Sequence, residues 1–156
     1  AKTDNSRGFD HCIFVPFMLI DPEATIPVVP LSLKRDLDPE EHLAAGRALA
    51  SLRDEGILIV GSGMSYHNMH GFRTPKALRP SATFDTWLTL AVGSDPEARW
   101  QSLTRWSEAP AGRESHPREE HLLPLMVAAG AGYEAKGSKP FGDHVMMADL
   151  SAFRFD

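Results

Sequence analysis

The chain has 156 residues, 42% hydrophobic and 24% charged, a composition typical of one ordinary globular domain and unlike that of disordered or fibrous chains. Its net charge of -5, with no stripe of lysines and arginines, argues against a nucleic-acid partner. A single cysteine, no apolar run of membrane-spanning length and no signal-peptide core together predict a cytoplasmic protein without a membrane partner.

The first predicted element is a short helix. Asp10 suits the N-cap, apolar residues recur at helical spacing after it, and the segment ends near Asp21, although Pro16 lies inside it. Residues 26–33 are apolar and rich in β-branched side chains, which predicts a strand that two prolines confine to an edge.

A second helix and a second strand follow. Residues 38–41 combine an N-cap aspartate, a proline and two glutamates, so a helix of about 16 residues is predicted from there to Gly56. The apolar run at 57–60 is typical of a buried strand. Gly61 and Gly63 end this strand and should let the backbone pass close to another group. The order strand, helix, strand predicts a parallel pair with a right-handed crossover.

The remaining chain predicts helices and a closing hairpin. An irregular segment, 73–80, precedes two amphipathic helices at 83–91 and 96–107, whose aromatic stripe we assign to core packing. A linker at 109–115 leads to a helix that opens within 115–121 and runs to about Ala129, and a hairpin or strand is expected at 145–148 and 151–155. The predicted fold class is therefore α/β, with a mixed, largely parallel sheet flanked by helices.

Three histidines lie at the ends of predicted elements: His11, His67 and His121. Strand ends and helix starts present side chains to a shared cleft. Imidazole binds zinc and non-haem iron, and it also moves protons near neutral pH. The spacing matches no dense metal motif, and Glu119-Glu120-His121 can equally be an acidic helix start, so both kinds of role stay open. For His70 and His116 we expect solvated loop and helix-cap positions.

Five motifs of the chain resemble a known enzyme family. They are Arg7-Gly8-Phe9-Asp10-His11, the segments 26–33, 52–56 and 61–68, and Glu120-His121-Leu122-Leu123-Pro124-Leu125. In order and approximate spacing, from Gly8 to Phe155, they look like the extradiol aromatic ring-opening dioxygenases of the DOPA-dioxygenase type, relatives of protocatechuate 4,5-dioxygenase.

The resemblance implies a non-haem Fe(II) enzyme, with Zn possible as the bound ion, that cleaves a catechol-type ring with O2. His67 matches a family histidine that is either a metal ligand or the base for a catechol proton, and His11 matches a second acid/base residue. His121 matches the C-terminal metal-site position, with Glu120 as the alternative ligand. Imidazole and carboxylate ligands with open positions suit Fe(II), since substrate and oxygen both need room.

The chain departs from the family in one important respect. Members carry two more metal histidines in an N-terminal half, in His-Gly-Ser-Pro and Ser-Ala-His-Trp type motifs, and this sequence has neither. Residues 1–156 are therefore expected to be a single domain or the C-terminal half of a larger α/β catalytic domain. A companion N-terminal chain or segment would complete the metal site, within an oligomer. Cys12 also stands where a glycine is usual.

Two other functions stay open from the sequence. The first is a non-catalytic partner or assembly subunit with the same fold, which the missing ligands favour. The second is a zinc-dependent hydrolase in which His67 acts as base toward a metal-bound water.

Overall fold

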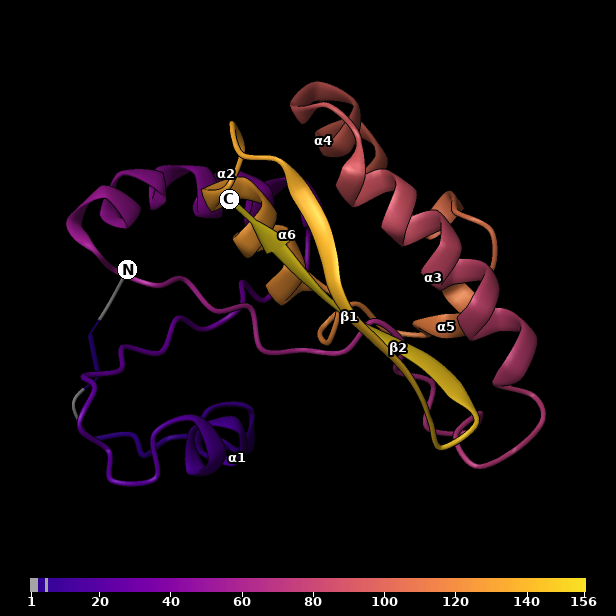
Figure 1. Cartoon of the computed structure of the whole chain (residues 1–156), viewed down its shortest axis with the longest axis horizontal. Helices are drawn as coiled ribbons and strands as arrows, with labels where there is room; N and C mark the ends of the chain where they lie inside the picture. The colour runs from indigo at the N-terminus through magenta and orange to yellow at the C-terminus, as the bar shows by residue number, and fades with distance from the viewer. Residues whose placement is uncertain (1–2, 5) are drawn as a thin grey trace. The chain divides into compact units, whose positions relative to one another are not determined.

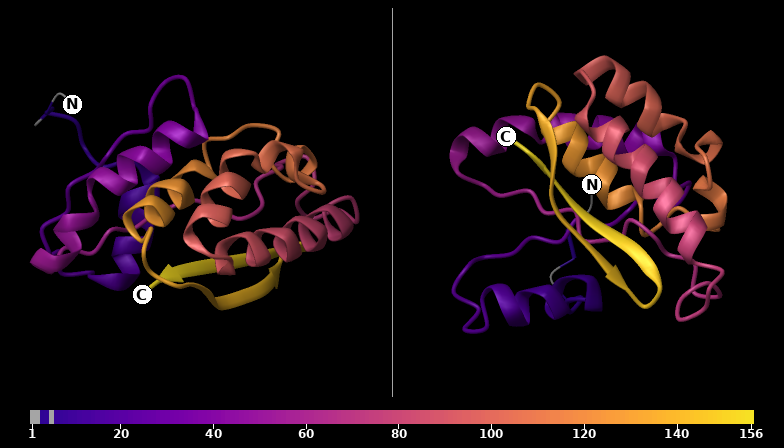
Figure 2. Two further views of the ribbon diagram at one scale, coloured as in Figure 1. Left: turned by 90° about the horizontal axis from the view of Figure 1, so that it is seen from above. Right: turned by 45° about the vertical axis from the view of Figure 1, so that its right-hand side comes forward.

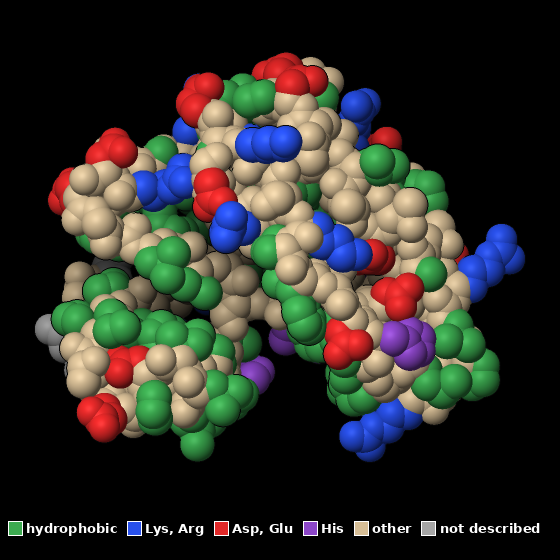
Figure 3. Space-filling model, viewed as in Figure 1, with side chains coloured by type: hydrophobic (Ala, Val, Ile, Leu, Met, Phe, Trp, Pro, Cys, Tyr) green, Lys and Arg blue, Asp and Glu red, His purple; other side chains and the backbone are tan. Residues whose placement is uncertain are grey.

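The computed structural model describes residues 3–4 and 6–156, and the chain forms two compact units, Ala1–Ser32 and Leu33–Asp156 (Figure 1). The N-terminal unit contains α1 (His11–Ile20). The Asp10 carboxylate accepts the backbone N–H of Cys12 at 3.1 Å, so the predicted N-cap and helix are confirmed. None of the α1 side chains is buried: Leu19 is 86% exposed, and hydrophobic side chains cover much of the visible surface of this unit (Figure 3).

The strand predicted at 26–33 is wrong, because this segment has no regular secondary structure. Val29 is 91% exposed, and no strand among the described residues pairs with the segment. Pro27 and Pro30 lack the N–H groups that donate hydrogen bonds in a sheet. Without a neighbouring strand, the other peptide groups have no partner that would stabilise an extended conformation.

The C-terminal unit begins with two helical segments, α2 (Pro39–Ala48) and η1 (Ala50–Glu55). The Asp38 carboxylate caps α2 by accepting the N–H of Glu41 at 2.9 Å, as the sequence predicted. The expected single helix instead tightens into a 3-10 helix after α2, and Gly56 ends it with a left-handed φ of 78°.

Helix α2 packs against α6 (Leu123–Ala131) through two glycines. A Cβ atom on Gly46 would overlap the carbonyl group of Val127, and one on Gly130 would overlap that of Leu43. The two backbones therefore approach each other more closely than side chains would allow. The helix predicted to open within 115–121 begins later, at Leu123.

Four further helical segments complete this unit: α3 (Leu78–Gly93), α4 (Pro96–Thr104), η2 (Trp106–Glu108) and α5 (Gly112–Ser115). Both amphipathic helices predicted from the sequence are present, although α3 begins earlier and α4 ends earlier than expected. Their apolar faces form one core with α6 and the end of the chain, as assigned from the aromatic stripe. Its fully buried members include Leu43, Phe84, Leu88, Leu103, Trp106, Leu123 and Met126.

The chain closes with an antiparallel hairpin of β1 (Gly137–Val145) and β2 (Ala148–Phe155), which packs along α3 (Figure 2). The strand expected at 151–155 is confirmed as part of β2, whereas the segment expected at 145–148 contains the turn of the hairpin, at Met146 and Met147, and most of β1 lies before it. Among the described residues this is the only sheet, so the expected largely parallel sheet is not supported. No helix in the described part of the chain is both long and apolar enough to cross a bilayer.

The buried strand predicted at 57–60 is also wrong. The segment is irregular, and Leu58 is 84% exposed. Among the described residues, no hydrogen bond joins the peptide groups of residues 58–60 to another segment. A strand exists only when its ladder groups have a neighbour, and this apolar run has none within the part of the chain described.

Candidate functional site

His67 and His121, singled out from the sequence, lie together in the structure. Their rings stack with centroids 3.5 Å apart and planes inclined by 24°. Two backbone hydrogen bonds join the segments that carry them: His67 N–H donates to Ser115 O at 3.0 Å, and Met64 N–H donates to His121 O at 2.9 Å. The pair therefore belongs to two chain segments that are held together along their backbones.

The glycines before His67 permit this close approach. A Cβ atom on Gly63 would overlap the carbonyl oxygen of His121, and one on Gly61 would overlap that of Pro124. The sequence indicated that these glycines let the backbone pass close to another group, and that interpretation is confirmed. The other group is the turn that bears His121 together with the start of α6.

His116 is the polar side chain of this region that sequence reasoning misplaced. It was expected in a solvated position, but its side chain is 0% exposed, and its Nε2–H donates to Ser65 O at 3.0 Å. Its neighbours Ser115, Pro117 and Arg118 are small or polar, so no apolar pattern indicated burial. By contrast His70, also expected in solvent, is exposed.

Burial determines the charge of these imidazoles. It lowers the pKa of His67 below the ordinary histidine value, and the nearby Glu120 carboxylate opposes that shift. Burial lowers the pKa of His116 to about 4, although its hydrogen bond to Ser65 acts in the opposite direction. Both rings are therefore neutral at pH 7, the state in which an imidazole nitrogen can bind a metal or accept a proton.

Glu120, the alternative ligand, lies next to the pair in sequence and is half-buried. Arg118 Nε lies 3.3 Å from Glu120 Oε2, close enough for an ion pair, although this buried oxygen accepts no hydrogen bond. The cation that this oxygen meets in the structure is therefore the Arg118 guanidinium, and a role of Glu120 as a metal ligand stays a prediction.

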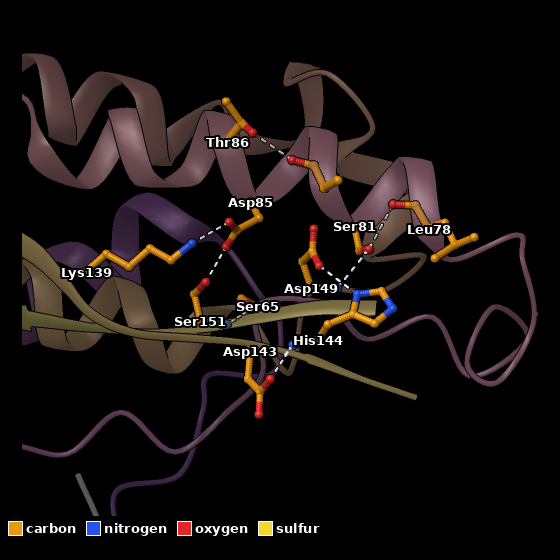
Figure 4. Close-up of polar contacts among 11 residues, drawn as sticks. Ser65, Leu78, Ser81, Asp85, Thr86, Lys139, Asp143, His144, Asp149 and Ser151 are labelled. Carbon is orange, nitrogen blue, oxygen red and sulfur yellow. Dashed lines mark hydrogen bonds and ion pairs between the residues drawn. The ribbon is translucent and has the colours of Figure 1, made fainter. Parts of the chain in front are cut away.

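A polar network anchors the segment before His67 to the hairpin and to α3 (Figure 4). Ser151 of β2 donates its backbone N–H to Ser65 Oγ at 2.8 Å, and its hydroxyl donates to Asp85 of α3. Lys139 of β1 pairs with the same carboxylate at 2.5 Å. The network extends to within two residues of His67 and was not visible in the sequence, since its members are far apart along the chain.

A groove of about 1330 Å³ opens beside the site. It is lined by residues 56–61, by Gly63, Met64, Ser65 and His121, and by the end of the chain from Ser151 to Asp156, with Leu122 and Leu125 among its apolar members. His121 therefore stands at the border of a wide, partly apolar opening.

The donors available to a metal are fewer than such a site needs. Within residues 3–4 and 6–156, no group of three or more His, Cys, Asp or Glu side chains is arranged to hold an ion. His67 and His121 bring two imidazole rings side by side, and Glu120 precedes His121 in the sequence. His11 is an exposed residue at the start of α1 in the N-terminal unit, so its role stays a prediction.

Comparison with known proteins identifies relatives over nearly the whole chain. Residues 1–152 match the family described as the catalytic LigB subunit of aromatic ring-opening dioxygenase. The dioxygenase tasH of Hapsidospora irregularis is 38% identical over 96% of this chain and 50% of its own length. The 4,5-DOPA dioxygenase extradiol of Beta vulgaris is 42% identical over 86% of this chain and 50% of its own length.

A solved structure shares the fold. The crystal structure of an uncharacterized protein from Escherichia coli K12 superimposes with a TM-score of 0.77 and 29% sequence identity, covering 96% of this chain and 64% of that one. The chain thus spans about half the length of the curated relatives it matches.

Proposed function

Since this chain belongs to the LigB family of aromatic ring-opening dioxygenases, we propose that it is part of a non-haem Fe(II) extradiol dioxygenase that cleaves a catechol-type ring with O2. The observation that supports this most is the stacked pair of His67 and His121, since both rings come from motifs that resemble the family's site. In this proposal the pair holds the metal, with Glu120 as the alternative to His121. Bound Fe(II) would supply a centre at which both catechol oxygens and O2 meet.

The side chains of this chain then have defined tasks. A neutral His67 either binds the metal or accepts a proton from a catechol hydroxyl through its free ring nitrogen, and its lowered pKa suits both. His11 would supply a second acid/base group. The hydrogen bonds of His67 N–H and Met64 N–H hold the two segments while a proton moves.

We further propose that a companion N-terminal polypeptide or segment completes the donor set. Relatives are about twice as long, and this chain exposes an apolar run at 57–60 beside the groove that His121 lines. Among the described residues, the peptide groups of residues 58–60 make no backbone hydrogen bond to another segment. Such a run is suited to pairing with a strand from another polypeptide.

Metal binding separates the two roles of His67. The chain, purified without oxygen, is loaded with Fe(II) or Zn(II) and its metal content is measured for the parent, His67→Ala and His121→Ala, with His70→Ala as the matched control on an exposed histidine. Loss of metal in both site variants assigns two ligands. Loss only in His121→Ala, with turnover lost in His67→Ala, assigns His67 as the base.

Turnover tests the reaction itself. The iron-loaded protein, isolated from its source under mild conditions so that any companion stays bound, is mixed with 3,4-dihydroxyphenylalanine while O2 and the ring-cleavage product are measured. We expect one O2 consumed for each ring opened. No O2 uptake by a metal-loaded complex would refute the dioxygenase, and hydrolysis without O2 uptake by the zinc form would support the hydrolase instead.

A further inference from the structure

His116 lies in the core, close to the His67 and His121 pair but outside it. Its ring packs edge-on against Phe84 at a centroid distance of 5.3 Å and against Trp106 at 5.9 Å. Both aromatic rings are fully buried and belong to the main core. The imidazole therefore has little freedom to move, and any group that it binds is held by the core.

The group that it binds is the chain segment leading to His67. Nε2–H of His116 donates to Ser65 O, and the residue before it, Ser115, accepts the backbone N–H of His67. Two consecutive residues thus hold the segment 65–67 through two hydrogen bonds. The backbone N–H of Ser151 binds Ser65 a second time, through the serine hydroxyl.

The second ring nitrogen of His116, Nδ1, lowers the stability that this side chain gives to the core, so stability alone does not explain a histidine at this position. Nδ1 of His116 is buried without a hydrogen-bond partner, which is unfavourable compared with an apolar side chain of the same size. What the imidazole offers in exchange is a rigid N–H donor aimed at Ser65. An apolar residue would pack equally well but would leave that carbonyl oxygen unpaired.

We infer that His116 is a positioning residue, which fixes Ser65 and thereby sets the place of the His67 ring against His121. The catalytic consequence rests on the proposed function, whereas the geometric claim does not. His116 itself touches no reacting atom in this arrangement, since it acts through the backbone of residues 65–67.

The parent protein provides the first test. In a ¹⁵N-edited NMR spectrum of the metal-free chain, we expect His116 as the Nε2–H tautomer, with a ring proton that exchanges slowly with water. An Nδ1–H tautomer, or a ring proton in fast exchange, would overturn the inference without the need for any variant.

Matched variants provide the second test. His116→Met keeps an apolar side chain of similar size and removes the donor, whereas His116→Gln keeps an N–H donor of similar reach, and His70→Met controls for loss of an exposed histidine. We expect amide exchange at Met64 and His67 to become about tenfold faster in His116→Met, with loss of the ring-to-ring nuclear Overhauser contacts between His67 and His121. His116→Gln should restore both signals.

Two results contradict the inference: a folded His116→Met that retains both signals, or a His116→Gln as perturbed as His116→Met. Because these readings need neither metal nor substrate, they stand even if the dioxygenase proposal fails. In the complete enzyme, His116→Met should lower kcat much more than it changes KM, and His116→Gln should restore kcat.

Discussion

Replacing Arg99 of α4 should destabilise the C-terminal unit more than most single substitutions. The side chain is 1% exposed, yet no carboxylate in the described part of the chain forms an ion pair with it. Its guanidinium instead donates to four carbonyl oxygens, at 3.0 Å to Ala135, 3.2 Å to Gly132, 2.5 Å to Tyr133 and 3.4 Å to Val92. These oxygens lie in the last turn of α3 and just beyond α6, where the negative ends of two helix dipoles meet.

The magnitude follows from that arrangement. Arg99→Met keeps most of the aliphatic volume but removes the donor of the carbonyl oxygens of Val92, Tyr133 and Ala135, of which the last two are part-buried, whereas Gly132 O still accepts the N–H of Ala135. Each carbonyl oxygen left without a donor costs about 1–3 kcal/mol. Because the variant no longer has to bury a charge, part of this cost is offset by the desolvation energy that is avoided. We expect the free energy of unfolding to fall by about 4 kcal/mol in total. In Arg99→Lys the charge is kept, but the lysine ammonium group cannot reach all four oxygens. The free energy of unfolding should fall by about 2 kcal/mol.

Urea unfolding followed by tryptophan fluorescence measures both values, because Trp106 lies in the same core. Arg105→Met is the matched control, since Arg105 directly follows the same helix but is exposed and should change stability by less than about 0.5 kcal/mol. If Arg99→Met unfolds within about 1 kcal/mol of the parent, the carbonyl cluster does not depend on the guanidinium and the reasoning is refuted.

Three other predictions concern packing, a turn and pH. Gly46→Ala should lower stability by about 2–3 kcal/mol in the same urea assay, because the added methyl group overlaps Val127 and forces α2 away from α6; an unchanged midpoint would contradict the close approach. Met146 and Met147 occupy a two-residue turn with φ of 52° and 65°, so changing them to Asn and Gly should raise stability by about 1–2 kcal/mol, and a loss would show that their side chains matter more than the backbone. The pKa of His116 is lowered to about 4 in the folded protein, whereas this histidine in the unfolded chain takes up a proton below about pH 6.5. The free energy of unfolding of the metal-free protein should therefore fall by about 3 kcal/mol between pH 7 and pH 4. His116→Gln should lack this part of the pH dependence.

Most of the helices and the last strand were predictable because their signals are local. Asp10 and Asp38 cap the helices that they were expected to cap, and Gly56 adopts the left-handed conformation expected of a helix end. The ends of the helices differ from the predicted ones where tertiary packing outweighs the local signals. An example is the helix from Pro39, which tightens into a 3-10 segment after Ala48. Capping and turn chemistry depend on a few neighbouring residues, so the sequence contains them in full.

The site was predictable in part, for a related reason. The meeting of His67 with His121 followed from motifs that resemble a family, and glycine spacing indicated the close approach. His116 and Ser151 could not be found in this way, because a hydrogen bond between residues 51 positions apart leaves no periodic pattern. Burial of a polar side chain is decided by the partners that it meets in space.

The failed strand at 57–60 and the site are linked through the glycines that separate them. Residues 57–60 lead directly into Gly61 and Gly63, which are seated on the turn of His121 and the start of α6. A strand that paired with 57–60 would restrict the same backbone that carries His67. If ordering of the site segment increases the affinity for a companion, then by thermodynamic linkage binding of the companion stabilises the ordered site segment to the same extent. Pairing at 57–60 and metal binding at His67 and His121 should therefore strengthen each other, and the affinity for a companion polypeptide should rise when the metal is bound.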